Sequence, residues 1–170
     1  IAIELNNHDQ FYLGTYSLNT SDNQQSFTGV GFQPVAMGLM STRSLDMNAA
    51  PSTHQGCVSF GMASGPSAQA SIVVSDKDSA SQAWALSSFN NANILDLRND
   101  QATIDSIGAL FQFEPNGFVI DYSYLPDSPW KILVWAIGAD ALGGTAPTLS
   151  DLQAVNITSS SVRATYDYAF

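Results

Sequence analysis

Short segments in which apolar and polar residues alternate recur along this chain, and they predict β-strands. Side chains of a strand point alternately to its two faces, so a period of two indicates a strand with one buried face. Alternating segments and apolar runs of strand length cover residues 1–5, 11–18, 35–40, 57–62, 70–75, 94–98, 109–113, 118–122, 131–138 and 162–170. No helical period is sustained over a dozen residues, although residues 79–88 are compatible with a short helix or with a strand centred on Trp84. The chain is therefore predicted to be all-β with little helix.

Two features of the pattern suggest how the strands are arranged. The clearest hairpin joins residues 109–113 to residues 118–122 through residues 114–117, Glu-Pro-Asn-Gly. Asn-Gly tolerates the positive φ angles that tight hairpin turns require. Residues 131–138 (KILVWAIG) are apolar almost throughout, which predicts a central strand covered on both faces. Many short strands separated by turn residues favour an antiparallel β-sandwich of the jelly-roll-like type.

The length of the chain fits one domain. We expect a single β-sandwich domain over residues 1–170, within the usual size of a domain. Residues 142–170 could form an added or exchanged strand segment. The longest apolar run, residues 132–139, is too short to cross a bilayer, so no membrane insertion is expected.

Charged residues make up only 12 % of the chain, about half the usual share for a soluble domain. The surface must therefore be covered by small polar side chains, as it is in extracellular sandwiches and virion-surface proteins. The net charge is −10, and the five Lys and Arg residues are scattered. Nucleic acids are bound mainly by neutralising phosphates with Lys and Arg, so no nucleic-acid partner is expected. Anionic lipid is disfavoured for the same reason, and sugars are the natural neutral class of partner.

No arrangement typical of an active site is recognisable, and the chain is not expected to be an enzyme. A Ser-His-Asp triad would have to use His8 or His54, and nothing in the sequence places a serine beside either of them. The single cysteine, Cys57, lies in an apolar setting and is predicted to be a small buried residue. Glu4 and Glu114 are the only glutamates, and no organised acid and base pair for glycoside hydrolysis is expected.

Neither a cofactor nor a metal is predicted. The Gly29-x-Gly31 pair has Pro34 where a phosphate-binding fingerprint would have its third glycine, so a tight turn leading into a buried strand is expected. Asp76 and Asp78 have the alternate spacing of a calcium loop. The glycine and the distant glutamate of such a loop are missing, so a solvated turn is the better interpretation.

A loop rich in aromatic residues and proline, residues 122–130 (YSYLPDSPW), is the candidate ligand-binding site. Aromatic faces stack on sugar rings, and carboxylates accept hydrogen bonds from sugar hydroxyl groups. Tyr124, Asp127 and Trp130 are therefore the candidate glycan-binding residues. The alternative is that these side chains are ordinary core or rim residues at the end of a strand.

Two stretches resemble a known group of proteins. Residues 13–17 (LGTYS) and 26–34 (SFTGVGFQP) are similar to the "GTYxGN…ITGLGFQPDLV" opening of phage and prophage tail-fibre and head-decoration proteins. Residues 116–120 (NGFVI) and 130–138 (WKILVWAIG) resemble the closing "DGFTI…YxYVAW" hairpin of the same proteins, including those of gene transfer agents. The chain departs from this pattern at residues 35–37 (VAM) and from Leu142 onward. No functional residue is transferred, because these motifs are structural.

The resemblance implies a β-sandwich or jelly-roll on the surface of a virion, extracellular, often a homotrimer and in contact with cell-surface polysaccharide. The leading hypothesis is thus a non-enzymatic virion surface structural protein, a tail fibre or a head decoration or spike, bound to itself and to other virion proteins. Self-association could bury residues 1–3 or the face of Tyr166, Tyr168 and Phe170. The alternative is a stand-alone, lectin-like carbohydrate-binding module of a secreted bacterial protein. A third hypothesis, a polysaccharide depolymerase, has no catalytic residues to support it.

Overall fold

The structure, a computed structural model, describes residues 10–46, 55–77, 84–98 and 103–139. Within these residues it contains ten β-strands and no helix, which confirms the predicted all-β fold. The strands are β1 (Phe11–Ser17), β2 (Gln24–Thr28), β3 (Pro34–Ser41), β4 (Gln55–Gly65), β5 (Ala68–Lys77), β6 (Trp84–Asn90), β7 (Leu95–Arg98), β8 (Ile104–Glu114), β9 (Gly117–Tyr124) and β10 (Lys131–Gly138).

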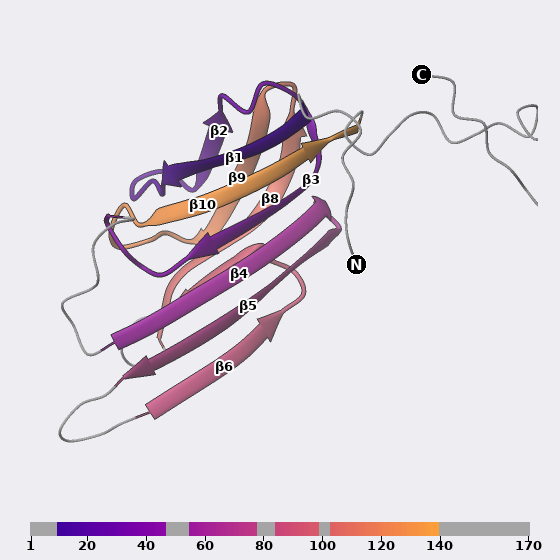
Figure 1. Ribbon diagram of the computed structural model, residues 1–170. Helices are drawn as coiled ribbons and strands as arrows, with labels where there is room; N and C mark the ends of the chain where they lie inside the picture. Colours follow the sequence, from indigo (N-terminus) through magenta and orange to yellow (C-terminus); the bar gives the residue numbers. More distant parts are fainter. Residues whose placement is uncertain (1–9, 47–54, 78–83, 99–102, 140–170) are drawn as a thin grey trace, which may run out of the picture.

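These strands form two antiparallel sheets that pack against each other as a sandwich (Figure 1). The larger sheet has the order β1-β10-β3-β4-β5-β6, and the smaller sheet has the order β2-β9-β8-β7. The predicted antiparallel β-sandwich is therefore confirmed. In Figure 1 the larger sheet lies in front, with β1 and β6 at its two edges.

The predicted strands that fall within the described residues are present, with some differences in extent. The segment around Trp84 is the strand β6 and not a helix over the residues described. Residues 109–113 are the end of a longer strand, β8, whose pairing with β9 shifts between Leu110 and Gln112. The strands predicted for residues 1–5 and 162–170, and the segment 142–170, lie outside the described residues.

The core lies between the sheets and is built from the inward positions of both. Phe27 on β2 and Phe118 on β9 are register partners, and their rings stack with centroids 4.8 Å apart. Tyr16 of the larger sheet packs edge-on against both rings, with centroids 5.2 Å and 6.1 Å away. Burying each large apolar side chain contributes about 2 kcal/mol, so this aromatic cluster is a main link between the sheets.

The predicted hairpin is present, with a different role for its glycine. Glu114 pairs with Gly117, so Pro115 and Asn116 form the turn. Asn116 does not adopt a positive φ angle, whereas Gly117 has φ 155°. A Cβ atom at Gly117 would overlap the main-chain carbonyl of Phe27. Glycine is needed here because β2 approaches the backbone of β9 closely, and not because of the turn alone.

The Gly29-x-Gly31 pair forms a turn that leads into β3, as predicted. Both glycines have positive φ angles, 93° and 90°, which glycine adopts without steric cost. The Asn116 carbonyl accepts hydrogen bonds from the amides of Gly29 (3.1 Å) and Val30 (3.3 Å). Its side-chain oxygen accepts one from the Gly31 amide (2.7 Å). The turn before β3 is thereby fixed to the β8–β9 hairpin.

The prediction for residues 131–138 was right about the position of the strand and wrong about its cover. β10 lies between β1 and β3, well inside the larger sheet. Ile132, Val134 and Ala136 face the smaller sheet and are fully buried. Leu133 and Trp135 point to the opposite face and are only half-buried. Among the described residues, no second layer covers that face.

Candidate functional site

The outward face of the larger sheet is apolar over most of its width. Cross-strand partners on one face of a sheet lie side by side, so the register defines continuous rows of side chains. One row runs over all six strands: Thr15, Leu133, Met40, Phe60, Ile72 and Phe89. The next row contains Leu13, Trp135, Gly38, Met62 and Ala70. We call this surface the outer apolar face.

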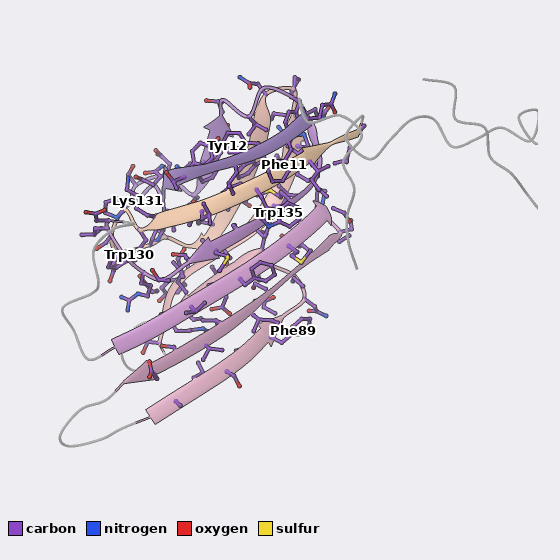
Figure 2. The ribbon with its side chains drawn as sticks, in the orientation of Figure 1. Phe11, Tyr12, Phe89, Trp130, Lys131 and Trp135 are labelled. Carbon is purple, nitrogen blue, oxygen red and sulfur yellow. The ribbon has the colours of Figure 1, made fainter. Side chains whose placement is uncertain are left out.

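Many of these side chains are open to solvent, although their size and apolar character suit a core. Eight large apolar residues of the outer apolar face are between 42 % and 68 % exposed: Phe11, Leu13, Met40, Val58, Met62, Ile72, Val74 and Phe89. Figure 2 shows Phe11, Trp135 and Phe89 on β1, β10 and β6, spread over the width of the sheet. Single exposed apolar residues are common on protein surfaces, but a contiguous patch of this kind marks an interaction site.

The indole of Trp135 lies low on the outer apolar face, close to the backbone of β3. Its register partner on β3 is Gly38, and a Cβ atom at Gly38 would overlap the indole ring, 2.6 Å from Cζ2. The indole therefore lies against the backbone of β3, where a larger residue than glycine would push it outward. Beside the indole the face has a hollow of about 300 Å³, whose lining includes Ala36, Met62 and Ala70.

The outward face of the smaller sheet differs in character. Its exposed residues are mostly polar: Gln24, Ser26, Thr28, Gln112, Asp121 and Ser123. Phe111, at the irregularity in β8, is an exposed apolar exception. The two outward faces of one sandwich are thus unlike, with an apolar one on the larger sheet and a polar one on the smaller sheet.

Charged side chains on the outer apolar face lie at one end of it. Lys131 begins β10, and its ammonium group donates a hydrogen bond of 2.6 Å to the Ser17 hydroxyl of β1. Asp76 lies near the end of β5 and is exposed. Because β10 and β5 run in opposite directions in this sheet, the start of β10 and the end of β5 lie at the same end.

The predicted glycan-binding residues lie in and beside the loop between β9 and β10, but they do not form one aromatic wall. Tyr124 ends β9 and is 54 % exposed, and Asp127 is exposed. Trp130 packs against the core, and the Arg43 guanidinium lies over its ring, 4.9 Å from the centroid. Tyr124 and Asp127 are therefore accessible, whereas the Trp130 ring already contacts the protein on at least one face.

A buried ion pair supports this loop from inside. The Arg43 guanidinium donates a hydrogen bond to the Asp105 carboxylate, whose side chain is fully buried. The other carboxylate oxygen of Asp105 accepts a hydrogen bond from the Asp127 amide (3.3 Å). Burial raises the pKa of Asp105, and the adjacent Arg43 lowers it in part. Sequence spacing gave no indication of this pair, which joins the segment after β3 to β8.

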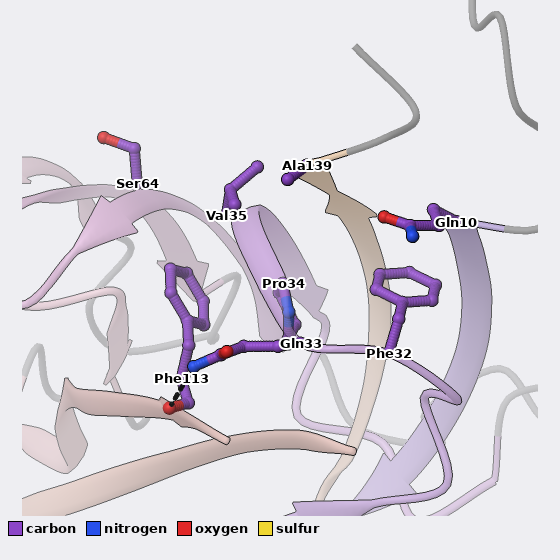
Figure 3. Close-up of a pocket in the computed structure, with 8 residues that line it drawn as sticks. All are labelled: Gln10, Phe32, Gln33, Pro34, Val35, Ser64, Phe113 and Ala139. Carbon is purple, nitrogen blue, oxygen red and sulfur yellow. Dashed lines mark hydrogen bonds between the residues drawn. The ribbon is translucent and has the colours of Figure 1, made fainter. Parts of the chain in front are cut away.

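A cleft of about 450 Å³ lies at one end of the sandwich, where β3 and β4 of the larger sheet meet the end of β8. Its walls include Phe32, Val35, Ser64 and Phe113 (Figure 3). The Gln33 side-chain amide reaches across to donate a hydrogen bond to the Phe113 carbonyl (3.3 Å). That amide holds the loop before β3 to the smaller sheet.

The other residues considered from the sequence are placed as follows. Cys57 is buried, as predicted, and burial raises the pKa of its thiol. Asp76 is at the rim of the outer apolar face, and His8, His54 and Asp78 lie outside the described residues. Within the described part of the chain, no group of three or more His, Cys, Asp or Glu side chains is arranged to hold a metal ion. The same residues contain no helix that is long and apolar enough to span a membrane.

Sequence reasoning missed the outer apolar face, although its signal was present. Strands that carry apolar residues on both faces read as continuous apolar runs, and residues 35–40 and 131–138 are such runs.

In comparisons with known proteins, no family model, curated protein or solved structure matches the chain.

Proposed function

We propose that this domain is a non-enzymatic structural protein of a virion surface, such as a subunit of a tail fibre or of a head decoration. Its work is to associate with other subunits and to present a polar surface outward. The observation that carries the proposal is the outer apolar face. The largest apolar patch on a typical monomeric protein is roughly 300–600 Å², and a subunit of an assembly buries such a face against a neighbour.

The contrast between the two outward faces supports this role. A subunit with one apolar and one polar face can bury the first and leave the second in solvent. The polar face, with the loop that carries Tyr124 and Asp127, would then form the exterior. Low charge and abundant small polar residues fit an extracellular surface of this kind.

The two motifs that resemble virion proteins also meet in space. Residues 26–34 and residues 116–120 are joined through the hydrogen bonds of Asn116 to the Gly29, Val30 and Gly31 amides. The two segments thus belong to one structural unit at this end of the sandwich. The resemblance further implies contacts with other virion proteins.

The test is whether the chain is a component of particles. Particles produced by a strain that carries the gene would be purified and analysed by mass spectrometry and by immunogold labelling with an antibody to the domain. We expect the chain in intact particles, with gold on their surface. A chain that is secreted or cell-associated but absent from particles would overturn the proposal.

A second function is supported by one observation: Tyr124, at the end of β9, and Asp127, in the loop that follows, are both exposed. An aromatic face and a carboxylate are the groups that bind sugars. The domain would then contact cell-surface polysaccharide, either on a virion or as a lectin-like module of a secreted bacterial protein. Binding of labelled polysaccharide to the purified chain tests this function.

A further inference from the structure

We infer that the outer apolar face is covered by a second copy of the same chain, packed sheet against sheet. The inference names the partner of the assembly surface and in that respect rests on the proposed function.

The open surface is large enough for a stable pairing. An aromatic side chain offers about 150–250 Å², and the aliphatic and Met side chains lie near the lower end of that range. The eight large residues, each about half exposed, therefore leave on the order of 700 Å² open. A standard protein interface takes about 800 Å² from each partner. The half-buried side chains between them, such as Phe60, Leu133 and Trp135, extend the same surface.

Two inner strands of the sheet, β10 and β3, have the composition of strands that are buried on both faces. In β10 the inward positions are Ile132, Val134 and Ala136, and the outward positions include Leu133 and Trp135. β3 likewise has Met37 and Leu39 inward and Met40 outward. Such runs are typical of sheets covered by a layer on each side. The smaller sheet supplies one layer, and a second sheet supplies the other.

The shape of the face suits another sheet. Two sheets pack about 10 Å apart with their strands within about 30° of parallel. The indole of Trp135 lies against Gly38, so β10 and β3 present no protruding ring to a neighbouring sheet. A contact between two identical faces is isologous and closes into a dimer, the commonest symmetry of oligomers.

The positions of the charges indicate where the two-fold axis lies. β3 and β4 are the two middle strands of the six, so an axis parallel to the strands and between them centres the contact. Such an axis places β10 of one copy over β5 of the other. It also places each end of one sheet over the same end of the other sheet. Lys131 of one copy then faces the end of β5 that carries Asp76 of the second copy. Charges of opposite sign meet there, and the remaining contact is mostly apolar.

The mass of the full chain in solution tests the pairing. Sedimentation velocity and light scattering over a concentration series should give a dimer of about twice the 18.1 kDa chain mass. Ile72→Glu places a charge on β5, within the face that the contact would bury, and should raise the dissociation constant about tenfold or more, because the carboxylate would be desolvated. Phe111→Glu is the matched control, since Phe111 is 49 % exposed on the other sheet and Ile72 is 50 % exposed on the outer apolar face.

Circular dichroism separates loss of pairing from loss of fold in these variants. A folded monomer for Ile72→Glu, with a dimer for Phe111→Glu, supports the pairing. Three outcomes would each overturn the pairing. The wild-type chain could be a monomer at all concentrations, or a monomer whose outer apolar face crosslinks to residues 140–170 of the same chain. It could also be a trimer that Ile72→Glu leaves unaffected.

A charge exchange tests the axis. Lys131→Glu and Asp76→Lys should each weaken the dimer, and the double variant should restore it. A double variant weaker than both single variants would overturn this axis. The outcomes for pairing and for function are distinguishable: a dimer absent from particles contradicts only the proposed function, and a monomer present in particles contradicts only the pairing.

Discussion

The side-chain oxygen of Asn116 accepts a 2.7 Å hydrogen bond from the amide of Gly31, although the two residues are 85 positions apart. The carbonyl of the same asparagine accepts hydrogen bonds from the amides of Gly29 and Val30. One residue in the turn of a hairpin in the smaller sheet therefore satisfies three amides of the segment that leads into β3 of the larger sheet. This contact fixes the two sheets at one end of the sandwich.

Asn116→Ala should lower the free energy of unfolding by about 1 kcal/mol, because the Gly31 amide loses its side-chain acceptor. The two hydrogen bonds to the main-chain carbonyl remain, which limits the loss. The measurement is the urea unfolding midpoint of the purified chain. Asn23→Ala is the control, since Asn23 is exposed and contributes its main-chain carbonyl to Tyr122. Equal losses in the two variants would contradict this role of Asn116.

Gly61→Ala should destabilise the sandwich by about 2 kcal/mol or more, because the inner face of β4 has no room for a methyl group. A Cβ atom at Gly61 would overlap the main-chain carbonyl of Ile94, the residue before β7, and backbone cannot move aside as a flexible side chain can. Gly65→Ala, on the same strand, is the matched control, because nothing lies within 4 Å of its Cβ position. Thermal unfolding of both variants would decide the matter, and similar midpoints would show that β7 can move away.

The strands and the β8–β9 hairpin could be predicted from the sequence because their signals are local. Alternation over five to eight residues depends only on which face of a strand is buried. The cover of β10 could not be predicted in the same way. Both its inward and its outward positions are apolar, which indicates burial on both faces. Over the residues described, the fold of one chain covers only one of these two faces. The sequence pattern thus carries information about an assembly as well as about the domain.

The environment of Trp130 was beyond sequence reasoning for a different reason. Its aromatic and acidic neighbours in the loop suggested a binding surface, and Tyr124 and Asp127 are indeed accessible. The Arg43 guanidinium over its ring comes from a distant segment, which the pairing of β3 with β10 brings alongside. Residue spacing within the loop cannot reveal such a contact.

Arg43→Met should lower the free energy of unfolding by about 3 kcal/mol near pH 7, because Asp105 would be left buried without its counter-charge. Burial raises the pKa of Asp105, and removing Arg43 should raise that pKa further. A carboxyl with a raised pKa in the folded state binds its proton more tightly folded than unfolded. The contribution of Asp105 to the stability of the fold is therefore fully present below the ordinary pKa of an Asp side chain. That contribution is lost as the pH rises through the raised pKa of the folded state.

The loss from Arg43→Met should accordingly be smaller near pH 4 than near pH 7. Urea unfolding at the two pH values measures it. The double variant Arg43→Met with Asp105→Asn has no carboxyl at this position, so the extra loss at neutral pH should disappear. A loss from Arg43→Met that is equal at both pH values would show that Asp105 does not govern the effect.

Tyr124→Ala should weaken the binding of cell-surface polysaccharide about tenfold or more and leave the unfolding temperature unchanged. The ring is 54 % exposed, so its removal takes away a stacking surface and little of the core. Phe111→Ala removes a ring of similar exposure from the same sheet and should leave binding intact.

Trp130→Ala is a poorer probe, because Trp130 packs against the core and its loss should lower stability as well as binding. Fluorescence titration with labelled polysaccharide, together with thermal unfolding, separates these effects. Binding that survives both Tyr124→Ala and Asp127→Ala would exclude the loop as the site and leave the outer apolar face as the interaction surface that this fold presents.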